Sequence, residues 1–102
     1  MIDFYRIFRA CATFGIPPLP FTEKELLRIE NKSIALSEKS LKSKEDDPIE
    51  TVVTSDGWII TVRKLDNYTP QMFAALLIAA DYYFLPIEKV RKVIEDSTSK
   101  TD

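Results

Sequence analysis

The sequence predicts an α+β fold, in which two helix–break–helix units surround a central buried helix and one or two antiparallel β-hairpins cover it. Three observations lead to this prediction. Residues 69–84, TPQMFAALLIAADYYF, contain a long uninterrupted apolar run. Two β-branched segments flank the dipeptide Asp56-Gly57. The pattern of residues 2–33 also recurs over residues 71–98.

Composition limits the kind of protein this is. The chain has 102 residues, of which 45% are hydrophobic and 29% are charged, as in one soluble globular domain spanning residues 1–102. Its formal net charge of −2 argues against a strongly electrostatic grip on nucleic acid. The apolar run is about half the roughly 20 residues that a membrane-spanning helix needs, so no membrane role is expected. The single cysteine, Cys11, excludes an internal disulfide.

Several chemistries lack the residues that they need. The chain has no histidine, which is the commonest general base and metal ligand. The two glycines, Gly15 and Gly57, are too far apart to build a phosphate-binding loop, and no group of residues has metal-ligand spacing. Cys11 lies on an apolar face with no histidine to activate it. We therefore expect no enzymatic activity, no catalytic residue, no metal and no cofactor.

Residues 2–33 predict the first helix–break–helix unit. Apolar side chains recur at helical spacing through residues 2–14, and the prolines that follow exclude a helix at the break. Thr22 and Glu25 form a capping-box pattern that starts a second helix. The end of this helix is left open, because residues 26–39 either continue it or form a second hairpin.

The middle of the chain predicts a connector and a hairpin. Residues 37–48 are almost entirely polar and are typical of a solvated connector or a frayed helix. Residues 50–64 predict a hairpin with a two-residue type I′ turn at its Asp-Gly pair. That turn would place Val53 and Trp58 on one face, which we expect to pack on the central helix.

The C-terminal part predicts the second unit. Thr69 is a favourable N-cap and Pro70 suits the first helical position, so the central helix is expected to start there and to run to Phe84. A short amphipathic helix should follow over residues 86–96. Residues 97–102 are expected to form a frayed tail.

The two helix–break–helix patterns suggest an internal duplication. When Pro17 is aligned with Pro86, the apolar positions before the first proline fall on apolar positions before the second. Two copies would be related by a pseudo-two-fold axis and would leave a seam between them. Independent helices that share one pattern are the alternative interpretation.

Binding is the function that remains. Aromatic residues gather near the breaks and the hairpin turn, which indicates a protein- or peptide-binding module. The partner is expected in the seam between the repeats or on a hairpin edge, and a homo-oligomer is left open. The residues expected to contact the partner are Phe14, Trp58, Tyr82, Tyr83 and Phe84.

The alternative is a helix-turn-helix-like nucleic-acid binder. The two predicted C-terminal helices fit its outline, and the last one carries Lys89, Arg91 and Lys92. Acidic residues on the same helix cancel that charge, and the break contains proline rather than the glycine that is common there. Nucleic acid is therefore ranked second.

The chain as a whole, from MIDFYRIFRACATF through GWIITVRK to LPIEKVRKVIED, resembles the small orphan proteins of filamentous viruses of hyperthermophilic archaea. The resemblance implies a viral protein that is made in an archaeal host and acts in the host cytoplasm or in the virion. It supplies no motif from which a functional residue could be carried over. The scarcity of thermolabile amides agrees with a hot habitat, since only Asn31, Asn67 and Gln71 occur.

Overall fold

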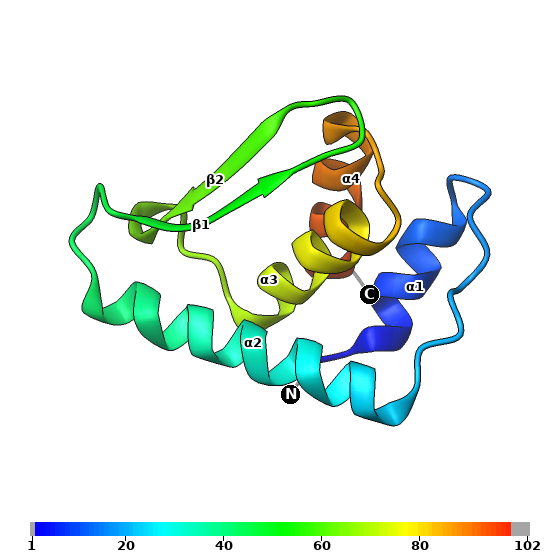
Figure 1. Ribbon diagram of the computed structural model, residues 1–102, viewed down its shortest axis with the longest axis horizontal. Helices are drawn as coiled ribbons and strands as arrows, with labels where there is room; N and C mark the ends of the chain where they lie inside the picture. Colours follow the sequence, from blue (N-terminus) through cyan, green and yellow to red (C-terminus); the bar gives the residue numbers. More distant parts are fainter. Residues whose placement is uncertain (1, 99–102) are drawn as a thin grey trace.

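The computed structural model describes residues 2–98 and confirms an α+β fold, with four α-helices and one two-stranded antiparallel hairpin in that range (Figure 1). A short 3₁₀-helix, η1, follows the hairpin, and a π-helical segment, η2, follows α3. In chain order the elements are α1 (Phe4–Ala12), α2 (Glu23–Lys42), β1 (Pro48–Val53), β2 (Ile59–Arg63), η1 (Lys64–Asp66), α3 (Pro70–Leu76), η2 (Leu77–Tyr82) and α4 (Ile87–Thr98).

Three helices begin at the capping side chains that their sequences contain. The Asp3 carboxylate accepts a hydrogen bond from the Arg6 N–H at 3.1 Å, which starts α1. The Thr22 hydroxyl accepts from the Glu25 N–H at 3.1 Å. The Thr69 hydroxyl likewise accepts from the third residue of α3 at 3.3 Å. Each side chain satisfies a backbone donor that has no partner inside its own helix.

Helix α2 decides between the two interpretations of residues 26–39, because these residues are helical throughout and form no second hairpin. The helix also includes residues 37–42, so the helical alternative predicted for residues 37–48 holds for the first part of that segment. Its buried stripe includes Ser33, whose hydroxyl donates to the Ile29 carbonyl at 2.7 Å. A serine satisfied in this way can face the core without leaving an unpaired polar group.

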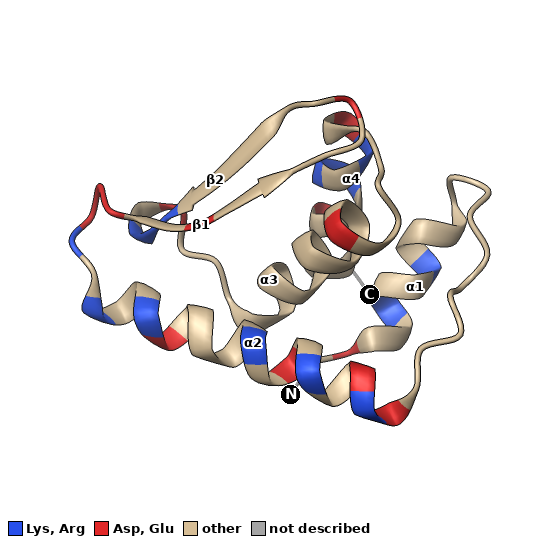
Figure 2. Cartoon of the chain, viewed as in Figure 1, with Lys and Arg blue, Asp and Glu red and all other residues tan. Residues whose placement is uncertain are grey.

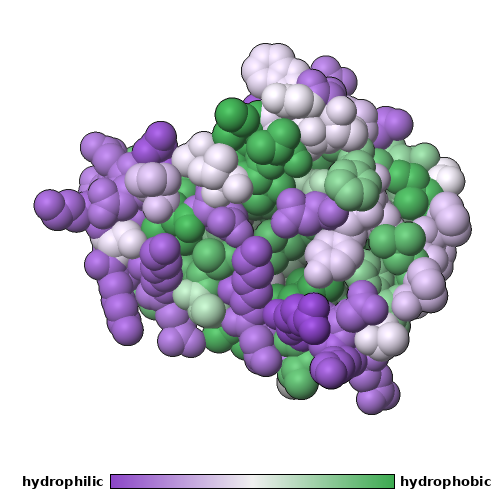
Figure 3. All heavy atoms as spheres, viewed as in Figure 1, coloured by the Kyte–Doolittle hydropathy of each residue, from purple (hydrophilic) through white to green (hydrophobic). Residues whose placement is uncertain are grey.

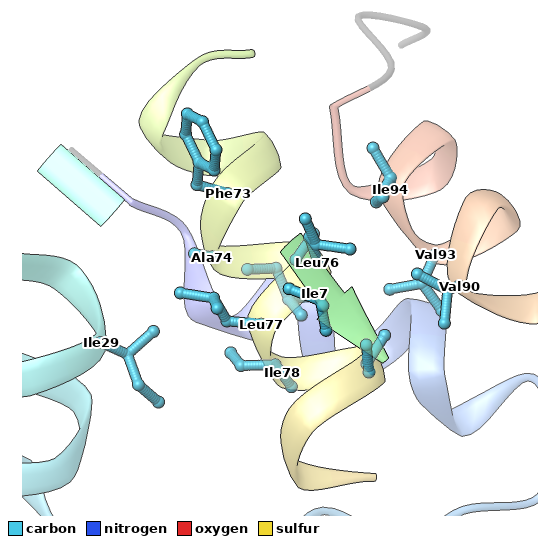
Figure 4. Close-up of a cluster of buried hydrophobic side chains, with 14 of the residues drawn as sticks. Ile7, Ile29, Phe73, Ala74, Leu76, Leu77, Ile78, Val90, Val93 and Ile94 are labelled. Carbon is cyan, nitrogen blue, oxygen red and sulfur yellow. The ribbon is translucent and has the colours of Figure 1, made fainter. Parts of the chain in front are cut away.

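The core lies along α3 and η2. Each of residues 73–80 is at most 2% exposed. These two segments contact α2, α4 and β1 (Figure 1). Figure 4 shows Ile7 of α1 and Ile29 of α2 directed toward Leu77 and Ile78, with the α4 side chains closing the cluster from the other side. Apolar side chains from every helix therefore share one core.

The expected continuous α-helix over residues 69–84 is wrong in its second half. The hydrogen-bond spacing along the chain increases at η2, where the Tyr83 N–H donates to the carbonyl of Ile78, five residues back, at 3.0 Å. A π-helical turn holds an extra residue and rotates the chain that follows it. The Leu85 N–H closes the segment on the Ala79 carbonyl at 3.0 Å, and Asp81 is turned to the surface.

The hairpin differs from its prediction by one residue. The Gly57 N–H donates to the Thr54 carbonyl at 3.0 Å and Gly57 has φ of +80°, so the loop is a type I turn followed by a left-handed glycine. Val53 consequently pairs with Ile59 and Val52 with Ile60. This shift turns Val52 inward and Val53 outward.

Trp58 was expected to pack on the central helix and does not. It lies beside Gly57 at the end of the hairpin and is 61% exposed. The residues that the hairpin buries against the core are Ile49, Val52, Thr54 and Val62. The predicted tail falls partly in α4, because Ser97 and Thr98 are helical. The rest of that prediction, residues 99–102, lies outside the described residues.

Among the described residues, three close helical segments with positive φ, namely Gly15 at +76°, Asn67 at +56° and Phe84 at +53°. The left-handed region is unfavourable for a residue with a Cβ atom by roughly 1–2 kcal/mol. Phe84 is nevertheless 63% exposed, so burial does little to offset its backbone conformation. A strained and exposed aromatic residue is a candidate for a functional role.

We expect Phe84→Gly to be more stable than Phe84→Ala by about 1 kcal/mol, because both lose the ring and only alanine keeps the Cβ atom. Gly15→Ala should lower the free energy of unfolding by a similar amount, since a Cβ atom there would meet nothing within 4 Å and only the backbone is strained. Urea unfolding followed by circular dichroism measures these differences. Alanine at 84 matching or exceeding glycine would show that Phe84 is not held in the left-handed region.

Candidate functional site

The five aromatic residues that were expected to contact a partner separate into two groups. Phe14, Tyr82 and Tyr83 are half-buried and pack against the core beside the loop of residues 13–22 (the proline loop), which contains Pro17, Pro18 and Pro20. The Tyr83 hydroxyl accepts from the Leu19 N–H at 3.1 Å. The Tyr82 ring lies 5.2 Å from that of Phe21. Only Trp58 and Phe84 are exposed, so the structure does not bring the five together as one surface.

Asp56 joins the hairpin turn to the start of α4. Its carboxylate accepts hydrogen bonds from the Thr54 hydroxyl, from the Trp58 N–H at 3.3 Å and from the Ile87 N–H at 3.1 Å. The Thr54 hydroxyl is the main reason that the pKa of Asp56 lies below its ordinary value of 3.8, and the two backbone donors lower it further. The turn and the helix N-terminus are thus held by one charged group.

The lowered pKa of Asp56 predicts a pH-dependent stability. A carboxylate whose pKa is lower in the folded than in the unfolded chain stabilises the fold above the unfolded value, and this contribution is lost as the pH falls through the folded value. We expect Asp56→Asn to be less stable than the parent at pH 7, with the difference shrinking in acid. Urea unfolding at a series of pH values tests this.

Asp46→Asn is the control for this prediction, because the Asp46 side chain is exposed and has no hydrogen bond within residues 2–98. The free energy of unfolding of Asp46→Asn should differ little from that of the parent at every pH. A difference between the parent and Asp56→Asn that stayed constant from neutral to acid pH would show that the charge of Asp56 does not contribute.

The outer edge of β2 carries two residues whose backbone groups point away from β1. The Thr54 N–H donates to the Trp58 carbonyl at 2.9 Å, which marks a hydrogen-bonded pair at the end of the ladder. Hydrogen-bonded and non-hydrogen-bonded pairs alternate in an antiparallel ladder, so Ile59 and Thr61 belong to non-hydrogen-bonded pairs. Their N–H and C=O groups are directed outward and have no hydrogen bond to any other described residue.

The next outward N–H along β2 is already occupied. The Arg63 N–H donates to the Asp66 carboxylate of η1 at 2.7 Å. Asp66 thus takes the position that a neighbouring strand's carbonyl would otherwise occupy, and it ends the accessible edge. The accessible part of the edge is therefore short and runs over Ile59 and Thr61.

A cleft of about 430 Å³ lies beside this edge, between β2 and α4. Its apolar lining includes Ile60 of β2 and Ile87, Val90 and Ile94 of α4, and the edge residues Ile59 and Thr61 line it as well. Asp66, Tyr68 and Arg91 supply the polar part. The volume is in the range of ordinary ligand clefts, which span roughly 300–1,000 Å³. An open strand edge and an apolar cleft thus lie next to each other.

Exposed apolar side chains continue from the edge onto the outer face of the hairpin. Val53 and Ile59 form a cross-strand pair that faces solvent, and Trp58 lies next to Ile59. Figure 3 shows hydrophobic side chains over the hairpin and toward α1, whereas hydrophilic side chains cover α2. Contiguous exposed apolar groups are typical of interaction sites.

The three basic residues of the nucleic-acid hypothesis are not gathered on one face. Lys92 pairs with Asp96 at 3.3 Å, and the Lys89 ammonium lies 5.5 Å from the centre of the Phe14 ring. Arg91 lines the cleft instead. Helical geometry puts Lys89 and Arg91 about 200° apart around α4. Basic and acidic residues are mixed along α2 and α4 (Figure 2).

Other kinds of site find little support in the described part of the chain. Residues 2–98 contain no cluster of three or more side chains suited to hold a metal ion. None of the helices in that range combines the length and the hydrophobicity that crossing a bilayer requires. No protein-family model, curated protein or solved structure matches the chain.

Proposed function

We propose that this protein is a non-catalytic peptide-binding module that takes an extended segment of another protein as an added strand on β2. The observation that carries the proposal is the outward N–H and C=O groups of Ile59 and Thr61, which lie beside an apolar cleft. A strand is the ligand that satisfies such groups in register, because it presents donors and acceptors at the same spacing.

The chemistry of the two faces supports this choice. A strand that adds to β2 directs alternate side chains toward the cleft and toward the outer face of the hairpin. On the cleft side they meet Ile60, Val90 and Ile94. On the outer face they lie next to the exposed Ile59. Both sets of side chains would bury apolar surface, which adds to the backbone hydrogen bonds.

The other predicted position, the seam between the repeats, is the weaker candidate. Phe14, Tyr82 and Tyr83 fill that region together with the proline loop. The hairpin edge combines unpaired backbone groups with an adjacent cleft. We therefore assign the binding surface to the edge, with Trp58 at one end of it.

Thr61→Pro tests the proposal. Proline removes the outward N–H of Thr61 and is tolerated where that N–H has no partner inside the sheet. Peptides are selected on the parent from a random display library, and their affinities are measured by fluorescence anisotropy. We expect Thr61→Pro to weaken binding at least tenfold, because one hydrogen bond and the close approach of the strand are lost.

The matched control is Thr51→Pro, because Thr51 pairs directly with Thr61 and its N–H points to the opposite edge of the hairpin. Thermal unfolding establishes that both variants are folded. Thr51→Pro should bind the selected peptides as the parent does. Equal binding by the parent and by Thr61→Pro, or equal losses in the two variants, would contradict strand addition at β2.

Salt dependence separates this proposal from nucleic-acid binding. Strand addition relies on backbone hydrogen bonds and apolar contact, so peptide affinity should change little between low and moderate salt. A nucleic-acid binder loses affinity steeply over that range as counterions are released. The nucleic-acid alternative would be favoured if the protein were retained on DNA, if this retention fell with salt, and if Lys89→Gln and Lys92→Gln abolished it.

The proposed duplication, with the buried run of residues 73–80 as its central helix, has support of its own. The alignment of Pro17 with Pro86 pairs Gly15 with Phe84, and both have positive φ. It also pairs the buried Cys11 with the buried Ala80. Helix α1 contacts α4, and α2 contacts α3, as two related pairs would, although the contact between α3 and α4 has no counterpart of similar extent between α1 and α2. At each of positions 15 and 84, we expect the alanine form to have a lower free energy of unfolding than the glycine form, by a similar amount. Unequal differences at the two positions would count against a duplication.

The proposed setting is a filamentous virus of a hyperthermophilic archaeon, with the protein in the host cytoplasm or in the virion. It is supported by the resemblance of the whole chain and by the scarcity of amides. Three immobilised proteins, the parent, Thr51→Pro and Thr61→Pro, are incubated with lysate of infected cells. Viral or host proteins retained by the first two and lost from the third are the expected partners. Retention of the same proteins by all three would contradict this setting for the β2 edge.

A further inference from the structure

The cleft between β2 and α4 contains one charged group that no other described residue engages. Asp66 and Arg91 are the charged residues in its lining. The Asp66 carboxylate is hydrogen-bonded to the Arg63 N–H. Arg91 is exposed and forms no ion pair within residues 2–98, where the two recorded pairs are Lys32–Glu50 and Lys92–Asp96. Its guanidinium is therefore available to a ligand.

A hydroxyl group accompanies this guanidinium. Tyr68 also lines the cleft, and its ring is held edge-on against Phe73 with the centres 5.3 Å apart. Burial raises the pKa of Tyr68, and the charge of Asp66 raises it further, while Arg91 acts in the opposite direction. The phenol thus keeps its proton at neutral pH and can donate a hydrogen bond, so the polar part of the cleft offers donors.

The spacing along α4 relates Arg91 to the apolar lining. Ile87, Val90, Arg91 and Ile94 share one face of the helix, with Arg91 at its flank. An added strand places every second side chain on the cleft side, about 7 Å apart. Because Ile60, Val90 and Arg91 line the same cleft, a strand added there would bring one such side chain to the apolar lining, and the next on the same side could approach the long Arg91 side chain.

We infer that the segment bound at β2 carries an apolar residue and a carboxylate two positions apart, with the apolar side chain in the cleft and the carboxylate on Arg91. This inference rests on the proposed function, because it concerns the same site. A guanidinium binds a carboxylate through paired hydrogen bonds that lysine cannot reproduce. The carboxylate belongs to a glutamate or aspartate side chain, or to the C-terminus of the partner.

Amidated peptides of alternating threonine and valine, with glutamate two positions from a central valine, are the probes. Matched peptides carry glutamine or lysine in place of the glutamate, and both orders of the pair are included because the strand direction is open. A further peptide ends in a free carboxylate at the glutamate position. Affinities are measured by anisotropy at low salt for the parent, Arg91→Gln, Arg91→Glu, Lys92→Gln and Thr61→Pro.

The parent should prefer the glutamate peptide to the glutamine peptide by about threefold to fivefold, as for an exposed ion pair. Arg91→Gln should remove this preference, and Arg91→Glu should reverse it in favour of lysine. Lys92→Gln should leave it unchanged, because Lys92 is paired with Asp96 outside the cleft. A preference for the free-carboxylate peptide over all amidated ones would assign the carboxylate to a C-terminus.

Two outcomes would overturn the inference and can be told apart. If the glutamate and glutamine peptides bind the parent equally, and Thr61→Pro weakens both, strand addition stands and the carboxylate site is wrong. If Thr61→Pro has no effect on any peptide, or no peptide binds, the proposed function fails and the carboxylate site fails with it.

Discussion

Replacing Phe73 by alanine is expected to lower the free energy of unfolding by about 3–5 kcal/mol, a large part of the total for a small domain. The Phe73 side chain is fully buried at the start of the core run, and it holds the Tyr68 ring that borders the cleft. Truncation removes the ring from an apolar environment and leaves a cavity that the surrounding helices can fill only in part.

The measurement is urea unfolding followed by far-ultraviolet circular dichroism, since Trp58 is too exposed to report on the core. Phe84→Ala is the matched control, because it removes the same ring from an exposed position and should change stability by less than about 1 kcal/mol. Equal losses in the two variants would mean that the burial assigned to Phe73 is wrong. Loss of Tyr68 packing should also weaken peptide binding at temperatures where Phe73→Ala remains folded.

Local sequence signals were sufficient for much of the fold. The caps at Thr22 and Thr69 are set by hydrogen bonds to backbone groups three residues away, so a short stretch of sequence predicts them. The hairpin around the Asp-Gly pair was predicted from residue types alone, and its existence is confirmed. These features depend on neighbours in the chain, which is why they could be predicted.

The register of the hairpin depended on a contact that local sequence does not contain. An Asp-Gly pair suits both a two-residue loop and a type I turn with a left-handed glycine. In the structure the Asp56 carboxylate reaches Ile87, thirty-one residues further along the chain. Docking of the turn on α4 accompanies the longer loop, and one residue of slippage exchanges the faces of β1.

The length of helix α2 and the π-helical geometry of η2 could not be predicted from local sequence either. Ser33 and Ser40 interrupt the apolar stripe of α2, so its sequence did not distinguish a long helix from a second hairpin. Both serines are nevertheless buried, and Ser33 is satisfied by its own helix. The change from α- to π-helical hydrogen bonds at Leu77 has no signature in the residue types, because the apolar run is equally compatible with both.

Side-chain types predict only part of the candidate site. Of the five aromatic residues that the sequence suggested, Trp58 and Phe84 are exposed, and the other three lie beside the proline loop. The groups that carry the proposed function are backbone atoms of Ile59 and Thr61, and no residue type indicates them. Arg91 was predicted for nucleic acid, and its place in the cleft follows from the position of α4 beside β2, which the residue types alone do not indicate.

Cys11 is expected to be almost unreactive in the folded protein. Its side chain is fully buried, and burial raises its pKa to about 12 from an ordinary value of 9.0. The thiolate is the reactive form, so at pH 8 its fraction should be about a thousandfold lower than in the unfolded chain. Exclusion of the reagent from the core slows the reaction further. Labelling should therefore require the chain to open.

The test is the rate of reaction with a disulfide reagent at pH 8, with and without denaturant. The control combines Cys11→Ala with Leu41→Cys, which places the thiol on α2 at a position that is 74% exposed, and this variant should react rapidly when folded. If labelling occurs from an open state in rapid equilibrium with the folded state, Phe73→Ala should accelerate labelling of Cys11 by the factor that its loss of unfolding free energy implies, because both residues belong to the same core. Rapid labelling of native Cys11, at a rate that Phe73→Ala does not change, would mean that α1 does not pack on the core as described.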